Sequence, residues 1–354
     1  MTHRSRSVRR MAAAGAALAL AGGLSACSSA STSASDASGE ELTTLRVALG
    51  WITNVEWAGF WIADDAGYYA EEGLEIEWLA GGPNAPTTMA SVAAGDADLG
   101  VEPSMQNWLQ SIPQGNDFVG VGTVYQDTPS ALLSLAEDPV ESVEDMKGAT
   151  ILGQEGTQPL IDAMFRVGGD EPDYEFVPVG FDVAPLVEGQ GKAYTAYATN
   201  QPIMLEETYG MSADDYVTLT YAELGLPQYG NVIYGDSSTI EEQSEAIEGF
   251  LRASIRGWLE NEEDPDLGAQ LAVEKYGADL GLDLTQQTRE NELQIPFLQS
   301  ELTEEKGLFW IDPERLAGPM YEGLEAAGVT DLPEVEDILD LSLLEKVYAD
   351  GPLS

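Results

Sequence analysis

Short apolar runs alternate with amphipathic stretches along most of the chain, which is the pattern of alternating β-strands and α-helices. The predicted strands cover 45–49, 74–79, 118–125, 131–135, 149–152, 174–179, 193–198, 216–219 and 231–234, with a very short one near Leu99. Helical spacing follows several of them, as over 57–69, 159–167 and 202–209. Beyond Thr239 the pattern is helical only, over 240–261, 266–277, 285–300 and 313–328.

This order predicts an α/β protein with two lobes that are discontinuous in sequence. Residues 42–128 and 231–354 would form the first lobe together with the C-terminal helices, and residues 129–230 would form the second. The chain would cross between lobes near Asp127 and again near Gly230. We expect a ligand to bind between the lobes, which would close by a hinge motion at the two crossings.

The loop after the first predicted strand has unusually many side chains suited to a flat polar ligand. It contains Trp51, Thr53, Asn54 and Trp57 and leads into a helix. In α/β proteins, ligand sites form where strands end and helices begin. The loop is therefore predicted to be one wall of a small-molecule cleft, with core packing of the two tryptophans as the alternative.

The N-terminal segment predicts export and lipid anchoring. Residues 1–26 have an arginine-rich leader and an apolar run that is short for a membrane span, so we interpret them as a signal peptide. The motif Leu24-Ser25-Ala26-Cys27 resembles a bacterial lipobox, and Cys27 is the only cysteine of the chain. Residues 27–41, rich in Ser and Ala, are predicted to be a lipidated flexible tether. The expected location is the outer face of the bacterial cell membrane, while Arg9-Arg10 leaves the export route open.

Charge excludes one class of partner. The chain has 15 Lys and Arg against 62 Asp and Glu, a formal net charge of −47. Such a chain repels nucleic acid at long range, so no nucleic-acid partner is expected. The carboxylates are scattered along helix flanks, and no segment has the alternating oxygen ligands of a calcium loop.

The missing residue types remove most enzyme classes. The only histidine is His3, in the leader, and the only cysteine is expected to be lipidated. Histidine-based triads, Cys-His catalysis and the usual zinc sites are therefore excluded. There is no phosphate-binding P-loop or dinucleotide-binding glycine motif. Hydrolysis by two carboxylates stays open. We predict a binding protein rather than an enzyme, without cofactor or metal.

Several motifs together resemble those of one family. The first motif begins with a strand, which is followed by W-x-x-N-x-x-[aromatic or His]-A-G, a helix and then G-Y-Y/F-x-x-x-G-L-x-[VI]. The matching residues in this chain are Trp51, Asn54, Trp57, Ala58, Gly59, Gly67, Tyr68, Tyr69, Gly73, Leu74 and Ile76. Segments 94–100, 125–129 and 197–202 resemble later motifs of the same family. The chain is thus similar to solute-binding proteins of ABC importers, in the group that binds thiamine-pyrimidine precursors or riboflavin. Binders of aliphatic sulfonates, taurine and nitrate are more distant relatives.

The resemblance implies a type 2 periplasmic-binding-protein fold and delivery of a captured solute to a membrane permease by a monomeric protein. Trp57 stands where pyrimidine-precursor binders often have histidine, which favours ring stacking at that position. A related fungal branch makes the thiamine pyrimidine by consuming its own histidine, with iron and pyridoxal phosphate. The mature chain has no histidine to consume, so that activity is not expected here.

We predict a ligand site of aromatic faces and amide side chains, each of which has a structural role as its alternative. The predicted site residues are Trp51, Asn54, Trp57, Glu102, Gln126, Glu155, Gly156, Thr157, Tyr197 and Asn200. Trp51, Trp57 and Tyr197 would stack on a ring, and the amides would bind its polar edge. Glu102 or Glu155 would pair with a cationic group. No Lys or Arg lies in these loops, so an uncharged or cationic planar solute is favoured over an anion.

Overall fold

The computed structural model describes residues 42–353. The predicted signal peptide, Cys27 and the tether lie outside the described residues. Within 42–353, none of the helices has the length and apolar character that crossing a membrane requires.

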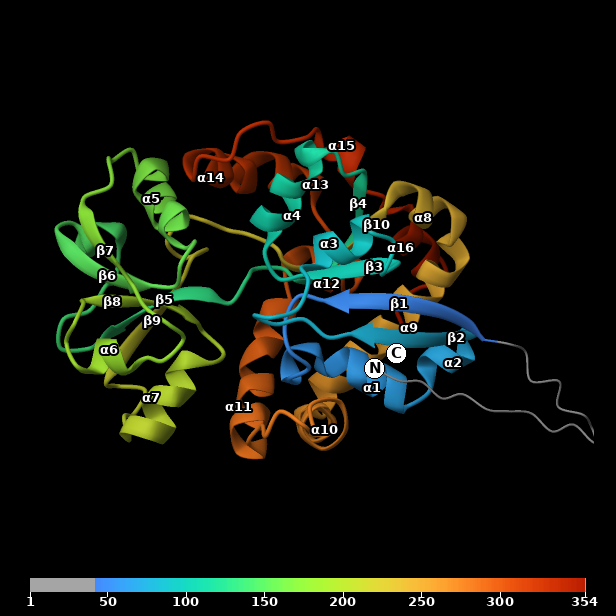
Figure 1. Ribbon diagram of the computed structural model, residues 1–354, viewed down its shortest axis with the longest axis horizontal. Helices are drawn as coiled ribbons and strands as arrows, with labels where there is room; N and C mark the ends of the chain where they lie inside the picture. The colour runs from blue at the N-terminus through green and yellow to red at the C-terminus, as the bar shows by residue number, and fades with distance from the viewer. Residues whose placement is uncertain (1–41, 354) are drawn as a thin grey trace, which may run out of the picture. The chain divides into compact units, whose positions relative to one another are not determined.

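The first of two five-stranded sheets has the order β2-β1-β3-β10-β4 (Figure 1). Its strands are β1 (Thr43–Leu49), β2 (Leu74–Leu79), β3 (Leu99–Glu102), β4 (Phe118–Tyr125) and β10 (Gly230–Asp236). β1 pairs in parallel with β2 and β3, whereas β10 lies antiparallel between β3 and β4. The alternating buried apolar positions of these strands place one core on each face of the sheet.

The second sheet has the order β7-β6-β8-β5-β9 and is also mixed. Its strands are β5 (Ser130–Leu135), β6 (Ala149–Gly153), β7 (Tyr174–Pro178), β8 (Ala193–Tyr197) and β9 (Tyr216–Thr220). All five come between β4 and β10 of the first sheet, so the chain leaves the first sheet, completes the second and returns. The protein therefore has two α/β lobes, each with its own hydrophobic clusters.

Helices cover both sheets (Figure 1). The second lobe has α5 (Gln158–Val167), α6 (Ala184–Val187), α7 (Gln201–Tyr209) and the single turn η3 (Val143–Met146). The helices before β10 in the first lobe are η1 (Val55–Trp57), α1 (Ala58–Asp65), α2 (Tyr68–Glu71), α3 (Thr88–Ala93), α4 (Met105–Ser111) and η2 (Ile112–Gln114). Those after it are α8 (Ser237–Glu242), α9 (Ser244–Glu263), α10 (Pro265–Leu271), η4 (Ala272–Tyr276), α11 (Leu284–Gln294), η5 (Ile295–Leu298), α12 (Glu301–Lys306), α13 (Pro313–Arg315), η6 (Leu316–Met320), α14 (Tyr321–Ala326), α15 (Val335–Ile338) and α16 (Ser342–Val347).

Some of the predicted helices are divided by local backbone chemistry. The predicted helix 57–69 breaks at Gly67, which has a left-handed φ of 80°. The predicted helix 285–300 ends at Gln294, because Pro296 cannot continue the ladder of backbone hydrogen bonds. Helix 313–328 is interrupted by a π-turn around Gly318 and Pro319. Four short helices, α6, α12, α15 and α16, were not predicted.

Two C-terminal helices also contact the second lobe. α14 packs against α5, and the Arg166 guanidinium donates a hydrogen bond to the backbone carbonyl of Ala326 at 2.6 Å. α11 contacts α7 of the second lobe. These contacts join the lobes on either side of the chain crossings (Figure 1).

Candidate functional site

The loop after β1 is held by its own hydrogen bonds. Asn54 caps η1, where its side-chain Oδ1 accepts a hydrogen bond from the backbone N–H of Glu56 at 3.2 Å. The indole N–H of Trp57 donates to the carbonyl of Ile52 at 3.0 Å, and that of Trp61 donates to the carbonyl of Asn54 at 2.8 Å. The loop is therefore preorganised, with Asn54 buried in a capping role.

The two tryptophans of this loop have different surroundings. Trp57 is fully buried and stacks on Phe60, with ring centroids 6.3 Å apart. Trp51 is partly exposed and meets Phe181 edge-to-face, with centroids 5.7 Å apart and an angle of 60°. Phe181 follows β7 in the second lobe and is 58% exposed. Trp51 thus reaches the second lobe, whereas Trp57 offers no free ring face in this structure.

Helix α11 buries a row of polar side chains along one of its faces. The buried members of the row are Gln287, Glu290, Asn291 and Gln294, at the spacing that usually belongs to an apolar face. The side chain of Gln287 accepts from the backbone N–H of Val55, and that of Gln294 donates to the carbonyl of Val55, both at 2.9 Å. α11 therefore fixes the turn that carries Glu56.

Three buried carboxyl groups lie around this turn. Glu290 Oε2 accepts hydrogen bonds from the side chains of Gln286 at 2.7 Å, Gln287 at 3.0 Å and Asn200 at 3.3 Å. The Thr88 hydroxyl donates to Glu102 Oε2 at 2.6 Å. The Oε1 atom of Glu56 is buried without a hydrogen-bond partner among the described residues.

These carboxyl groups lack a cationic partner. Burial raises the pKa of Glu56 to about 8, helped by the charge of Glu290, and burial raises the pKa of Glu290 itself to about 7. Burial also raises the pKa of Glu102. No Lys or Arg of residues 42–353 is among the groups that shift these pKa values. The environment thus disfavours negative charge.

The second lobe contributes two predicted site residues to the same place. Asn200, between β8 and α7, donates its side-chain hydrogen bond to Glu290 of the first lobe. The phenol of Tyr197, at the end of β8, has a pKa raised by burial and by the charges of Glu56, Glu290 and Glu102. The acidic cluster, defined here as Glu56, Glu102 and Glu290, therefore lies where the two lobes meet.

Three further predicted residues lie at the start of α5. Glu155 is exposed, Gly156 has a left-handed φ of 95°, and the Thr157 hydroxyl donates to the carbonyl of Gln154 at 2.9 Å. No hydrogen bond joins these residues to the acidic cluster within residues 42–353. They follow β6, which is parallel to β7 and β8, so they lie on the same edge of the second sheet as Phe181 and Tyr197.

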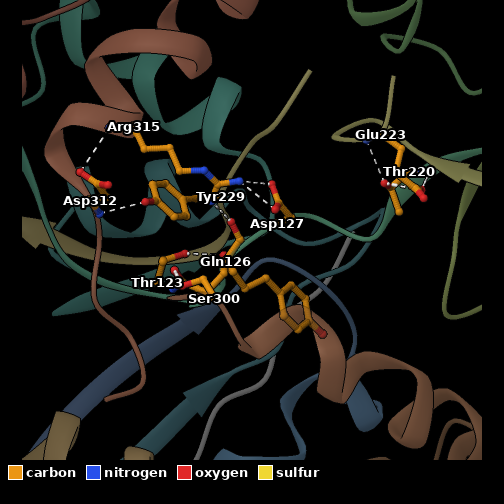
Figure 2. A network of polar contacts seen from close by, with 10 residues as sticks. Thr123, Gln126, Asp127, Thr220, Glu223, Tyr229, Ser300, Asp312 and Arg315 are labelled. Carbon is orange, nitrogen blue, oxygen red and sulfur yellow. Dashed lines mark hydrogen bonds and ion pairs between the residues drawn. The ribbon is translucent and has the colours of Figure 1, made fainter. Parts of the chain in front are cut away.

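Gln126 lies at the first crossing and uses both ends of its side chain for structural contacts (Figure 2). Its Nε2 donates to the carbonyl of Trp310 at 2.9 Å, and its Oε1 accepts from the Ser300 hydroxyl at 2.8 Å. Arg315 donates to the Gln126 carbonyl at 2.6 Å and to both oxygens of Asp127 at 2.7 and 2.8 Å. The crossing is thus tied to the C-terminal part of the chain.

Four residues of this junction were not predicted from the sequence. They are Glu56, Phe181 and Glu290, together with Asn231 at the start of β10, which lies beside Glu56. The sequence does contain a signal for Glu290. Polar residues at i, i+3, i+4 and i+7 give the helix a second polar face, and a helix that packs on the protein must bury one of its faces. Glu56 stands between apolar neighbours in a loop, which is unusual for an exposed carboxylate.

Two surface hollows are present, and neither is lined by the acidic cluster. One, of about 510 Å³, lies between α3 and α4, and the other, of about 400 Å³, lies beside α6 in the second lobe. Among the described residues no group of three His, Cys, Asp or Glu side chains is arranged to hold a metal ion.

Curated proteins of similar sequence include two binding proteins and one synthase. The chain is 28% identical over 298 residues to the riboflavin-binding protein RibY of Chloroflexus aurantiacus, covering 82% of this chain and 83% of that protein. It is 26% identical over 267 residues to a formylaminopyrimidine-binding protein of Halalkalibacterium halodurans, covering 72% and 77%. A 4-amino-5-hydroxymethyl-2-methylpyrimidine phosphate synthase of Legionella pneumophila is 24% identical over 227 residues, covering 63% and 71%.

Solved structures share the fold. The aliphatic sulphonate-binding protein SsuA of Escherichia coli superposes with a TM-score of 0.64 at 15% identity, covering 85% of this chain and 98% of that one. This likeness confirms the predicted periplasmic-binding-protein fold. The sequence profile described as NMT1/THI5 like matches residues 54–267, more than half of the chain. The chain therefore belongs to the NMT1/THI5-like family.

Proposed function

We propose that this protein is an extracytoplasmic solute-binding lipoprotein of an ABC importer, and that it captures a small planar heteroaromatic solute between its lobes. The observation that carries the proposal is the junction at which Trp51 and Glu56 of the first lobe meet Phe181, Tyr197 and Asn200 of the second. Aromatic faces and hydrogen-bonding groups from both lobes converge there, as recognition of a flat polar ring requires. The riboflavin- and pyrimidine-binding relatives support the same class of solute.

The aromatic part of the proposed site does not include every ring that the sequence predicts. Trp51 and Phe181 are the partly exposed rings that meet across the lobes. Trp57 is enclosed by the core, so it supports the loop from below and is not part of the proposed contact surface. Stacking of a solute ring on Trp51 contributes about 0.5–1.5 kcal/mol beyond the area that it buries.

The lack of a cation at the junction argues against an anionic solute. Glu56, Glu102 and Glu290 are buried there, and no Lys or Arg of residues 42–353 is among the groups that shift their pKa values. A sulfonate or nitrate ion bound there would leave water without a cationic partner, which costs several kcal/mol. An uncharged or cationic ring with donor groups would instead satisfy the carboxyl oxygens.

The cellular part of the proposal rests on sequence alone. Cys27 would carry the lipid after removal of residues 1–26, and the solute would pass to a membrane permease. The mature protein would act as a monomer and would not alter the solute, since it has no histidine or free cysteine for nucleophilic catalysis. Palmitate labelling of cells that express the full chain should mark the wild type and leave Cys27→Ser unlabelled. Labelling of Cys27→Ser would contradict the anchor.

A thermal-shift panel tests the solute class. The mature protein is heated with riboflavin, aminopyrimidines, alkanesulfonates or nitrate, each in large excess. A solute at 100 times its Kd adds about 2.7 kcal/mol to the free energy of unfolding, so a planar ring should raise the Tm by several degrees and remain chemically unchanged. Stabilisation by an alkanesulfonate or nitrate alone would refute the proposal.

Two variants connect the binding to the junction. Trp51→Ala and Phe181→Ala should each weaken binding of the stabilising ring about tenfold, because each removes one aromatic face. Tyr209→Ala is the matched control, since Tyr209 is also partly exposed but lies at the end of α7. Isothermal titration calorimetry measures the affinities. Unchanged binding by both Trp51→Ala and Phe181→Ala would show that the ring binds elsewhere.

A further inference from the structure

Three buried polar atoms at the junction lack hydrogen-bond partners among residues 42–353. They are Oε1 of Glu56 and both side-chain polar atoms, Nδ2 and Oδ1, of Asn231. Glu56 is 8% exposed and Asn231 is fully buried. A buried polar group without a partner costs about 1–3 kcal/mol, so native proteins rarely keep several together without a function.

The two side chains face each other from different elements. Asn231 lies at the start of β10, where the chain returns to the first lobe, and has a left-handed φ of 54°. Its side chain lies close enough to Glu56 for hydrogen bonding to lower the pKa of that carboxyl group, although the contact does not reach the distance and angle of a full hydrogen bond. The backbone around Glu56 is fixed by α11 through Val55. Both groups are therefore held in place without satisfying each other.

Other polar groups complete the surroundings of Glu56. Glu290 of α11 and Glu102 at the end of β3 raise its pKa by their charges. The phenols of Tyr125 on β4 and Tyr197 on β8 lie near enough for Glu56 to raise their pKa values in turn. Since Tyr197 belongs to the second lobe, opening of the lobes would separate it from Glu56 and expose the subsite.

We propose that Glu56 and Asn231 form the specificity-determining subsite for a ring edge on which a ring nitrogen stands beside an exocyclic amino group. This inference rests on the proposed function, because it names the solute edge that the proposed site recognises. An undissociated carboxyl group has one donor and one acceptor, which match the nitrogen acceptor and the amino donor of such an edge. Asn231 adds a donor and an acceptor for a neighbouring polar position of the ring.

The protonation state of Glu56 follows from its surroundings. Because burial and the nearby carboxylates raise its pKa to about 8, the carboxyl group holds its proton at pH 7. It can then donate to the ring nitrogen. Above pH 8 the proton is lost, and the carboxylate faces the lone pair of the ring nitrogen. Affinity for the aminopyrimidine edge should therefore fall up to tenfold per pH unit above 8.

The test compares two small rings by calorimetry with the mature protein at pH 6.5 and pH 9. The probes are 4-amino-2-methylpyrimidine, which has the edge, and 2,4-dimethylpyrimidine, in which a methyl group of similar size replaces the amino group and cannot donate a hydrogen bond. We expect wild type to bind the amino probe at least tenfold more tightly than the dimethyl probe at pH 6.5. We also expect the affinity for the amino probe to fall at pH 9.

Variants separate the proposed pairing from simple polarity. Glu56→Ala should lose at least tenfold in affinity for the amino probe at pH 6.5. Glu56→Gln keeps one donor and one acceptor, so it should bind within about threefold of wild type and show no loss at pH 9. Asn231→Gly removes the amide but tolerates the left-handed backbone, and it should also lose at least tenfold. Glu262→Gln is the control, because Glu262 is a carboxyl with a raised pKa outside the junction.

Each remaining outcome has a distinct meaning. Wild-type affinity in folded Glu56→Ala, or a loss in Glu56→Gln equal to that in Glu56→Ala, would overturn the pairing. Binding of riboflavin but not of the amino probe would overturn this inference while the proposed function stands. If no planar ring binds the wild-type protein, the proposed function itself fails. Far-ultraviolet circular dichroism confirms that every variant is folded.

Discussion

At the scale of single residues, the junction contains groups that reduce stability in the absence of a solute. Glu56 and Glu290 are buried near each other, and burial raises both pKa values. A buried carboxylate without a cation costs several kcal/mol unless it takes up a proton. Hydrogen bonds from Gln286, Gln287 and Asn200 offset part of that cost at Glu290. Such a loss of folding stability is typical of a binding site rather than of a hydrophobic core.

The raised pKa of Glu290 predicts a pH-dependent stability. The folded protein holds this proton up to about pH 7, whereas the unfolded chain loses it near 4.5. The stabilisation is complete below pH 4.5 and is lost as the pH rises through 7, about 3 kcal/mol in total. Glu290→Gln has no proton to lose at this position. The unfolding free energy of wild type should therefore fall relative to that of Glu290→Gln between pH 5 and pH 9.

Urea denaturation at pH 5, 7 and 9 measures this difference. Glu292→Gln serves as the control, because Glu292 is on the same helix but is exposed and paired with Arg289 at 3.0 Å. The unfolding free energy of Glu292→Gln should differ from that of wild type by the same amount at pH 5, 7 and 9. Parallel pH curves for Glu290→Gln and wild type would show that Glu290 is not a buried acid with a raised pKa.

At the scale of elements, the sequence predicts strands well because each is a short apolar run between turn residues. The predicted crossing into the second lobe and the return strand follow from the same pattern. Side-chain roles are harder to predict, because Trp51 and Trp57 have the same chemistry and only tertiary packing decides which ring stays partly exposed. Phe181 gives no signal, since a single aromatic residue in a loop is common.

Helix α11 shows why part of the candidate site escaped prediction. Its polar residues are expected to face solvent, yet Gln287, Asn291 and Gln294 are buried and hydrogen-bonded. The reason is that their partners are backbone and amide groups of η1 and α9 that lie far away in the sequence. Periodicity alone cannot identify such partners.

The crossing of α1 and α9 depends on two glycines. A side-chain carbon at Gly257 would lie 2.1 Å from the carbonyl oxygen of Gly59, and one at Gly59 would lie 2.2 Å from the ring of Trp258. Gly257→Ala should therefore push the helices apart and lower the unfolding free energy by about 1–3 kcal/mol. Because α1 follows the loop of Trp51, solute binding should weaken as well.

Gly249→Ala on the same helix is the matched control. A side-chain carbon there would lie 3.1 Å from the Cβ atom of Glu72, a contact that a shift of a few tenths of an ångström relieves. Alanine also favours the helix over glycine by up to about 1 kcal/mol, which offsets that shift. Urea denaturation should place Gly249→Ala near wild type and Gly257→Ala below it. Equal stability of Gly257→Ala and Gly249→Ala would mean that the helices do not approach at Gly257.

At the scale of the whole described chain, Arg315 connects the crossings between the lobes (Figure 2). Its guanidinium binds both oxygens of Asp127 and the carbonyl of Gln126 at the first crossing. It also lies 5.4 Å from the ring centre of Tyr229, beside the second crossing. The phenol oxygen of Tyr229 accepts a hydrogen bond from the backbone N–H of Asp312 at 2.9 Å. One side chain therefore anchors both crossings to the C-terminal part of the first lobe.

Arg315→Met should reduce stability and loosen the relation between the lobes. The methionine keeps part of the aliphatic stem, so the main loss is the bidentate ion pair with Asp127. The carboxylate of Asp127 is partly buried and would remain without its cation, which costs about 1–3 kcal/mol. Adding Asp127→Asn to this variant removes the unpaired charge and should recover part of the loss. Urea denaturation measures both variants.

Small-angle X-ray scattering tests the effect on the lobes, because it reports the average separation of the two masses in solution. Without the Arg315 anchor, the crossings have more conformational freedom, so the radius of gyration of solute-free Arg315→Met should exceed that of wild type. A saturating ring solute should reduce the difference, since binding to both lobes favours the closed state in either protein. Arg166→Met provides the comparison, because Arg166 joins α5 to α14 away from the crossings. A radius unchanged in Arg315→Met but increased in Arg166→Met would assign control of the opening to the contact between α5 and α14 instead.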